Sequence, residues 1–238
     1  MPTRIGTLAE KSLHAQLKQR FALPGDLLEY TLDGYVIDIA RPGAAPGEPD
    51  FRCIEIQTRG LAKMKPKLRA LLPRRPVHVI LPVAAETTIV RLDAAGAPAS
   101  RRKSPKHGSA LHVFAELVGL PTVLADPHFT LEVLLTREEQ IWRDDGQGSW
   151  RRKRWSIYDR RLLGVLGSLA LTCPGDCAAL LPAGLPERFT CRDLAAAAGV
   201  PLPLAQKMAY CLRQMGLIDS TGKQGNARVY TRHSAGAR

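Results

Sequence analysis

The chain has 238 residues, of which 45% are hydrophobic and 5% aromatic, and its formal net charge is +12. This composition excludes a disordered chain, and the length allows two small domains. No apolar run approaches the ~20 residues of a membrane span, and the N-terminus lacks the apolar core of a secretion signal. We therefore expect a cytoplasmic protein with no membrane association, whose positive charge attracts polyanions, nucleic acid first among them.

The first part of the chain predicts a helix, a hairpin and a third strand. Residues 7–21 place leucines at helical spacing. Two apolar runs flank Asp33-Gly34, and this arrangement is a strong hairpin signal. A further strand is expected over residues 51–57, after a loop rich in glycine, proline and alanine.

The middle of the chain predicts a mixture of helices and strands. Residues 61–72 indicate a helix with Pro66 in its first turn or at a kink. The almost wholly apolar residues 77–83 are typical of a central or parallel strand. Residues 94–109 are expected to be a flexible basic loop, and residues 110–119 a helix. A strand over 129–136 follows, and the segment around 150–155 is its expected partner.

The last part of the chain predicts a helical unit with a terminal hairpin. Residues 158–171 are strongly apolar and are expected to form a helix, which gives two domains, 1–154 and 155–238. Thr190 is placed to cap a short helix that Gly199 ends. A longer helix over 202–216 comes next, followed by two short strands around a polar, glycine-containing turn.

This C-terminal pattern resembles the winged helix-turn-helix family, in which the second helix of the motif enters the major groove and the wing contacts the flanking backbone. The resemblance implies that the nucleic-acid-facing residues are Pro203, Gln206, Lys207 and Arg213 in the helix, and Lys223, Gln224 and Arg228 in the wing. Winged helices also serve as protein–protein modules, and this alternative stays open.

A denser basic run lies between Trp150 and Trp155. It contains Arg151, Arg152 and Arg154. We expect these side chains to contact the DNA backbone, because the run joins the two expected domains. The alternative is a charged edge strand whose side chains simply face solvent.

Two acidic residues interrupt apolar strands in the N-terminal half. Asp38 lies in the second hairpin strand, and Glu55 lies in the third strand, two residues before Gln57. Residues two apart in a strand share a face, so Glu55 and Gln57 are expected to project together. A carboxylate in an apolar run is costly unless it is paired or binds a metal. Asp38 and Glu55 are therefore candidate ligands for Mg²⁺ or Mn²⁺.

These residues resemble the motif of the PD-(D/E)XK, or restriction-endonuclease-like, nuclease superfamily. The resemblance implies an α/β (α+β) fold with an αβββαβ core, in which Asp38, Glu55 and Gln57 are catalytic and Glu10 adds a carboxylate from the first helix. Glu10 also has the spacing of a helix-capping residue. Gln57 stands where the motif has lysine, and glutamine cannot supply positive charge. A lysine of the next helix, Lys63, Lys65 or Lys67, is a candidate for the missing cation.

The resulting hypothesis is a DNA-binding, metal-dependent nuclease that hydrolyses phosphodiester bonds. DNA repair or defence against foreign DNA would suit such an enzyme. The alternative is a catalytically inactive nuclease fold that serves as a DNA-binding adaptor or transcription regulator, and the departure at Gln57 favours it. Either protein is expected to act on DNA, as a homodimer or as a subunit of a larger complex.

Overall fold

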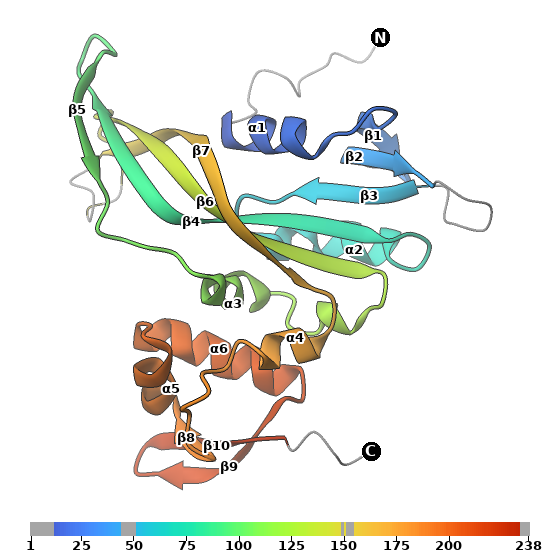
Figure 1. The fold of residues 1–238 in the computed structure, drawn as a ribbon, viewed down its shortest axis with the longest axis vertical. Coiled ribbons are helices and arrows are strands. Elements are labelled where there is room, and N and C mark those ends of the chain that lie inside the picture. The colour runs from blue at the N-terminus through green and yellow to red at the C-terminus, as the bar shows by residue number, and fades with distance from the viewer. Residues whose placement is uncertain (1–11, 44–50, 149, 151–154, 234–238) are drawn as a thin grey trace.

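The structure is a computed structural model that describes residues 12–43, 51–148, 150 and 155–233. It is a mixed α/β protein in which one large sheet is covered by helices on both sides, with a smaller sheet near the C-terminus (Figure 1). The elements up to residue 171 are α1 (Ser12–Phe21), β1 (Leu27–Leu32), β2 (Tyr35–Pro42), β3 (Phe51–Ile56), η1 (Leu61–Met64), α2 (Lys65–Leu71), β4 (Val77–Leu92), β5 (Pro98–Lys103), η2 (Ala110–His112), α3 (Val113–Leu117), η3 (Val123–Ala125), β6 (Phe129–Arg143) and β7 (Ser156–Leu171). The remaining elements are α4 (Pro174–Ala178), β8 (Arg188–Thr190), α5 (Cys191–Ala198), α6 (Leu202–Gln214), β9 (Ile218–Gln224) and β10 (Ala227–Arg232).

The large sheet has the strand order β1-β2-β3-β4-β6-β7, and β5 pairs with β4 outside this path. The β3–β4 and β4–β6 pairs are parallel, and the other pairs are antiparallel. The β1–β2 turn confirms the predicted hairpin, since Asp33 and Gly34 have φ values of 50° and 80°. Two consecutive positive φ angles are the signature of the tight turns that match strand twist.

Two apolar clusters lie on opposite sides of the sheet. The smaller one joins α1 to the sheet through Leu13, Leu17, Ile39, Ile54 and Ile80. The larger one takes its side chains from the other face of the sheet and from α2, α3, α4 and α6. The sheet therefore separates α1 from the other helices (Figure 1).

The helix expected over residues 61–72 is present as η1 followed by α2, with Pro66 in the first turn of α2 as predicted. Proline is tolerated there because its missing N–H would have no helical partner. The prediction of a flexible loop over residues 94–109 is wrong for the central residues Pro98–Lys103. These residues form β5, which pairs with β4 from Thr88 to Leu92.

The helix expected over residues 158–171 is also wrong, because these residues belong to β7. This strand pairs antiparallel with β6, from Leu131–Leu171 to Arg143–Ser156. Gly164 and Gly167 lie in the middle of the segment, and each glycine costs a helix about 1 kcal/mol relative to alanine. The partner strand β6 lies 13 to 40 residues earlier and supplies the backbone hydrogen bonds, and a local apolar pattern does not reveal it.

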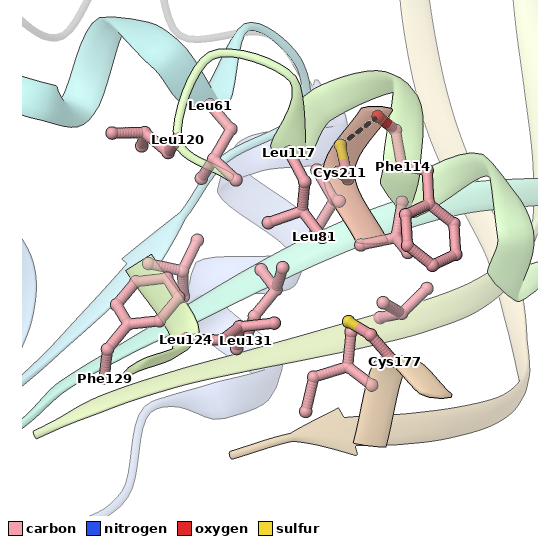
Figure 2. Packing of buried hydrophobic residues seen from close by; sticks show 14 of the residues in the cluster. Leu61, Leu81, Phe114, Leu117, Leu120, Leu124, Phe129, Leu131, Cys177 and Cys211 are labelled. Carbon is pink, nitrogen blue, oxygen red and sulfur yellow. Dashed lines mark hydrogen bonds between the residues drawn. The ribbon is translucent and has the colours of Figure 1, made fainter. Parts of the chain in front are cut away.

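The boundary expected between residues 154 and 155 moves for the same reason. Because β7 completes the large sheet, this sheet ends at Leu171 and the helical unit begins after it. The two parts share one apolar cluster, in which α6 packs against α3. Figure 2 shows Cys211 of α6 beside Phe114 of α3, where the Cys211 thiol donates to the Phe114 carbonyl at 3.7 Å.

The C-terminal unit contains the predicted helices and hairpin. Thr190 caps α5 by accepting the N–H groups of Arg192 and Asp193, and Gly199 ends it with φ 62°. β10 matches the expected returning strand, β9 is longer than expected, and β8 joins them in a sheet of order β8-β10-β9. No helix in the described part of the chain is long and apolar enough to cross a membrane.

The shared cluster predicts that the large sheet and the C-terminal unit unfold together. Phe114 is fully buried between them, so Phe114→Ala should lower the free energy of unfolding by about 3–5 kcal/mol while one cooperative transition remains. Urea denaturation followed by circular dichroism and by tryptophan fluorescence measures both quantities. The exposed Leu166 provides the control, Leu166→Ala. Two separate transitions in the wild-type protein would refute the shared core.

Candidate functional site

Asp38 lies where β2 and β3 separate. The last paired residues are Ile39 and Ile54, and this register places Asp38 across from Glu55. Beyond the pair, the Ile56 N–H donates to Asp38 Oδ2 at 2.8 Å instead of to a β2 carbonyl. His14 of α1 reaches the same oxygen, with Nε2 at 3.2 Å. The Asp38 carboxylate therefore accepts a backbone hydrogen bond from β3, and contacts with Ile56 and His14 fix its orientation.

The β1 backbone is distorted opposite Asp38. Leu28 pairs with Ile39 and Tyr30 with Ile37, but Glu29 between them is unpaired and has φ 50°. A non-glycine residue with positive φ in a strand is uncommon and costs energy. Such distortions concentrate at functional sites, so the position of Glu29 supports a special role for Asp38.

Glu55 is almost fully buried, with 5% of its surface exposed. Lys67 of α2 forms an ion pair with it, with Nζ 2.5 Å from Glu55 Oε1, and also donates to the Val36 carbonyl at 2.6 Å. Oε1 of Glu55 is buried, and the Lys67 ammonium is its charged partner. Among the three lysines proposed as cations, Lys67 is the one that contacts a candidate catalytic carboxylate.

The two carboxyl groups differ in pKa. Burial, together with the charge of Asp38, raises the pKa of Glu55 to about 7, although Lys67 opposes the shift. Burial also acts to raise the pKa of Asp38, but the hydrogen bonds from His14 and the Ile56 N–H and the charges of His14 and Lys67 outweigh it and lower that pKa. At neutral pH Asp38 is ionised, whereas Glu55, with a pKa of about 7, is about half protonated. Neighbouring groups with divergent pKa values are typical of reactive sites.

Gln57 does not join the carboxylates in the way its spacing predicts. It follows the last residue of β3, and its amide Nε2 donates to the carbonyls of Arg59 and Gly60. The amide thereby closes the turn that leads into η1. Gln57 has a structural partner in this turn, and Lys67 is the polar group that approaches Glu55 from outside the strands.

This turn after β3 is held by two further side chains. Glu116 of α3 accepts the N–H groups of Gly60 and Leu61 at 2.7 and 3.0 Å. Arg160 of β7 donates to the Thr58 carbonyl at 3.4 Å. Arg160 is itself fixed by the fully buried Glu138, with Nε 2.9 Å from Oε2 and Nη2 3.0 Å from Oε1. Charged hydrogen bonds of this kind are stronger than neutral ones and make the turn rigid.

The oxygen ligands that Asp38 and Glu55 offer meet only part of what a Mg²⁺ site needs. No group of three or more histidine, cysteine, aspartate or glutamate side chains in the described part of the chain is arranged to hold a metal. Glu10, the third expected carboxylate, lies outside the described residues. The two carboxylates Asp38 and Glu55 still fit Mg²⁺, which is commonly bound through one or two carboxylates, water and substrate phosphate.

The candidate nucleic-acid-binding residues of the C-terminal unit are all exposed. They are Gln206, Lys207, Arg213, Lys223 and Arg228. Gln206 and Arg228 line a groove of about 670 Å³ between the starts of α5 and α6 and the β9–β10 turn. Lys223 lines a smaller groove beside Arg188. The expected basic run of Arg151, Arg152 and Arg154 lies outside the described residues.

The sequence does not indicate two residues of the site, His14 and Glu116. His14 is one of several polar residues of an amphipathic helix, and Glu116 is an ordinary acidic residue of a second helix. Their contacts with Asp38 and with the Gly60 N–H depend on how α1 and α3 pack on the sheet.

The pKa of Glu55 predicts a pH-dependent stability. Because the folded-state pKa is about 7 against an ordinary 4.5, the folded protein holds this proton more tightly than the unfolded chain. The stabilisation from Glu55 is complete below pH 4.5 and is lost as the pH rises to 7, a change of about 3 kcal/mol. Urea denaturation from pH 4.5 to 8 should show this loss in the wild-type protein and in Asp93→Asn, but not in Glu55→Gln. Equal pH slopes in all three proteins would contradict the shift.

Comparisons with known proteins identify a family. A model described as "Domain of unknown function (DUF8091)" matches residues 11–172, which end at the end of the large sheet. The chain is 34% identical over 233 residues to an "Uncharacterized protein" from Treponema pallidum (strain Nichols), an alignment that covers 98% of this chain and 89% of that relative. No solved structure matches the chain. The chain belongs to the DUF8091 family.

Proposed function

We propose that the protein is a metal-dependent nuclease that binds DNA and hydrolyses its phosphodiester bonds. The observation that carries this proposal is the convergence of Asp38, Glu55 and Lys67 where β2 and β3 separate. Two carboxylates and a cation in a largely buried position are the groups that metal-assisted phosphodiester hydrolysis requires.

The chain order around these residues supports the proposal. The elements α1, β1, β2, β3, α2 and β4 follow one another in the αβββαβ order of the PD-(D/E)XK superfamily. Asp38 lies on the second of these strands and Glu55 on the third, as in that motif. The distorted backbone at Glu29 supplies an independent reason to regard this place as functional.

Asp38 and Glu55 are the residues that would hold Mg²⁺ or Mn²⁺. A bound divalent ion supplies a Lewis acid for the scissile phosphate and a water of lowered pKa. Asp38 is ready to bind because His14 and the Ile56 N–H keep it ionised and oriented. Glu55 has to release its proton first, so cation affinity should rise as the pH passes 7.

Lys67 replaces the motif lysine in this proposal. It comes from α2 rather than from β3, and its side chain is largely buried beside Glu55. With a cation held by Asp38 and Glu55, the Lys67 ammonium would be placed to stabilise the negative charge that develops on the phosphate. Gln57 then needs no catalytic role and serves the turn that it closes.

The C-terminal unit supplies the proposed DNA-binding surface. The order α4, β8, α5, α6, β9, β10, with the strand arrangement β8-β10-β9, corresponds to a winged helix-turn-helix in which α4, not the segment 158–171, is the first helix. Gln206, Tyr210 and Arg213 follow at helical spacing on the exposed side of α6. In this arrangement α6 is the helix that enters the major groove and the β9–β10 hairpin is the wing.

One observation favours a second candidate, an inactive DNA-binding adaptor or transcription regulator. The Lys67 ammonium is ion-paired with Glu55, and the Gln57 amide donates to the Arg59 and Gly60 carbonyls of its own turn. In an inactive protein this ion pair would be permanent, and the carboxylates would not bind a metal.

A cleavage assay separates the two candidates. The protein is incubated with plasmid, linear duplex, single-stranded and branched DNA in Mg²⁺, Mn²⁺ or EDTA. Metal-dependent cleavage should fall by about 100-fold or more in Asp38→Asn, Glu55→Gln and Lys67→Ala, since each removes a group that stabilises the reacting phosphate or its metal. Gln57→Ala should change the rate by less than about threefold, because its amide bonds only the turn.

The control for this assay is Asp93→Asn, which keeps the side-chain hydrogen bond of an exposed turn far along the sheet. Circular dichroism checks that every variant is folded. Salt-sensitive DNA binding without cleavage on any substrate would reject the nuclease and favour the adaptor. A rate lost in Gln57→Ala but kept in Lys67→Ala would reject the role of Lys67 and return the catalytic role to Gln57.

A further inference from the structure

The large sheet extends beyond the candidate site and carries a polar pocket there. β3 ends at Ile56, which pairs with Ile80, but β4 continues to Leu92 between β5 and β6. The pocket has a volume of about 470 Å³. Its lining residues, which define the β5 pocket, are Glu86, Thr87, Thr88, Lys103, Ser104, His107 and Arg137.

A bulge and a folded-back segment form the pocket. The β4–β6 register shifts between Ala84 and Glu86, and residues 104–108 return over this irregularity. His107 Nδ1 lies 3.0 Å from the Ala85 carbonyl, and the Gly108 N–H donates to the Ala84 carbonyl at 2.9 Å. A Cβ on Gly108 would lie 2.5 Å from the Ala84 oxygen, so only glycine permits this approach. The segment expected to be a flexible basic loop is thus fixed to the sheet at this point.

The β5 pocket is cationic around a single carboxylate. Arg137 Nε donates to Glu86 Oε2 at 2.7 Å. Arg137, followed by the charges of Lys103 and His107, lowers the pKa of Glu86. Ser104 Oγ accepts the Lys106 N–H, so its own hydrogen is available as a donor. Cations and hydroxyls around one bound carboxylate form a site that suits a tetrahedral oxyanion in its place.

We propose that the β5 pocket binds a phosphate group of the nucleic-acid backbone, with Arg137 and Lys103 as its cations and Glu86 as the group that the phosphate displaces. This inference rests on the proposed function, since it places a second contact for the same polymer. Neighbouring charge favours a polymer over a free anion: Arg102 and Lys106 lie exposed along the same segment, as does Arg101, which pairs with Glu139 at 3.2 Å.

The distance along β4 fits one continuous ligand. The pocket residues Glu86 and Thr88 follow Ile80, which lies beside the candidate site, by six and eight residues. At about 3.3 Å per residue, this separation is at most about 20–26 Å. A duplex covers that span with roughly six to eight base pairs, at about 3.4 Å each. The separation between the candidate site and the pocket is therefore shorter than one helical turn of a duplex.

The test is equilibrium binding of a fluorescent 30-base-pair duplex in EDTA, at 50 to 200 mM salt. Lys103→Ala/Arg137→Ala should bind about tenfold more weakly near 0.1 M salt, with a shallower salt dependence, because each lost phosphate contact removes about 0.9 from the slope. Glu86→Gln should bind several-fold more tightly, because it removes the competing carboxylate. Arg69→Ala/Arg74→Ala removes two exposed cations of α2 and the turn after it, and should match the wild-type protein.

The other outcomes overturn the inference in distinguishable ways. If wild-type protein binds the duplex and Lys103→Ala/Arg137→Ala binds it equally well, the pocket assignment fails and the proposed function stands. If the wild-type protein binds no nucleic acid, the proposed function fails and the inference fails with it. Calorimetric titration with inorganic phosphate measures whether the pocket binds the free anion. Micromolar phosphate binding that the double variant loses, without any change in duplex binding, would assign the pocket to a free anion.

Discussion

The burial of Glu55 beside one lysine is the constraint on which the rest of the site depends. A carboxylate that is 5% exposed is stable in its charged form only with a positive partner, and Lys67 on α2 is the partner that the structure provides. α2 must therefore begin close to the end of β3, and the turn between them has to be tight. Gln57, Gly60 and Glu116 all contribute to that turn. Asp38 adds a second carboxylate at the same place, so above pH 7, where Glu55 is ionised, two negative charges face one ammonium.

The turn after β3 also connects distant parts of the molecule. Glu116 holds it from α3, which packs on α6 of the C-terminal unit, and Arg160 holds it from β7 of the extended sheet. The close approach of Gly119 to Ala62 shows how tightly the chain after α3 packs on η1. The proposed DNA-binding helix, the extended sheet and the carboxylate site thus share one rigid support. In a nuclease, such a support fixes the distance between the place where the polymer binds and the place where it is cut.

Much of the fold could be predicted from local pattern. The Asp33-Gly34 hairpin, the proline at the start of α2 and the Thr190 cap each depend on residues close together in sequence. The β7 strand could not be predicted in this way, because its apolar run looks helical until its pairing with β6 is known. The residues of the candidate site also fall into those that the sequence indicates and those that depend on packing. Asp38 and Glu55 were conspicuous as charges in apolar strands, and the helix lysines were candidates by charge, but the choice of Lys67 depends on the packing of α2. His14 and Glu116 depend wholly on such packing.

The most direct test of the central claim is Mn²⁺ binding, measured by the electron paramagnetic resonance signal of free Mn²⁺. The titration is made at pH 6 and pH 8, with and without duplex DNA. We expect tighter binding at pH 8 than at pH 6, because Glu55 must lose its proton, and loss of binding in Asp38→Asn and Glu55→Gln. Mn²⁺ binding that neither substitution weakens, or no binding in the presence of DNA, would contradict the assignment of these carboxylates to a metal.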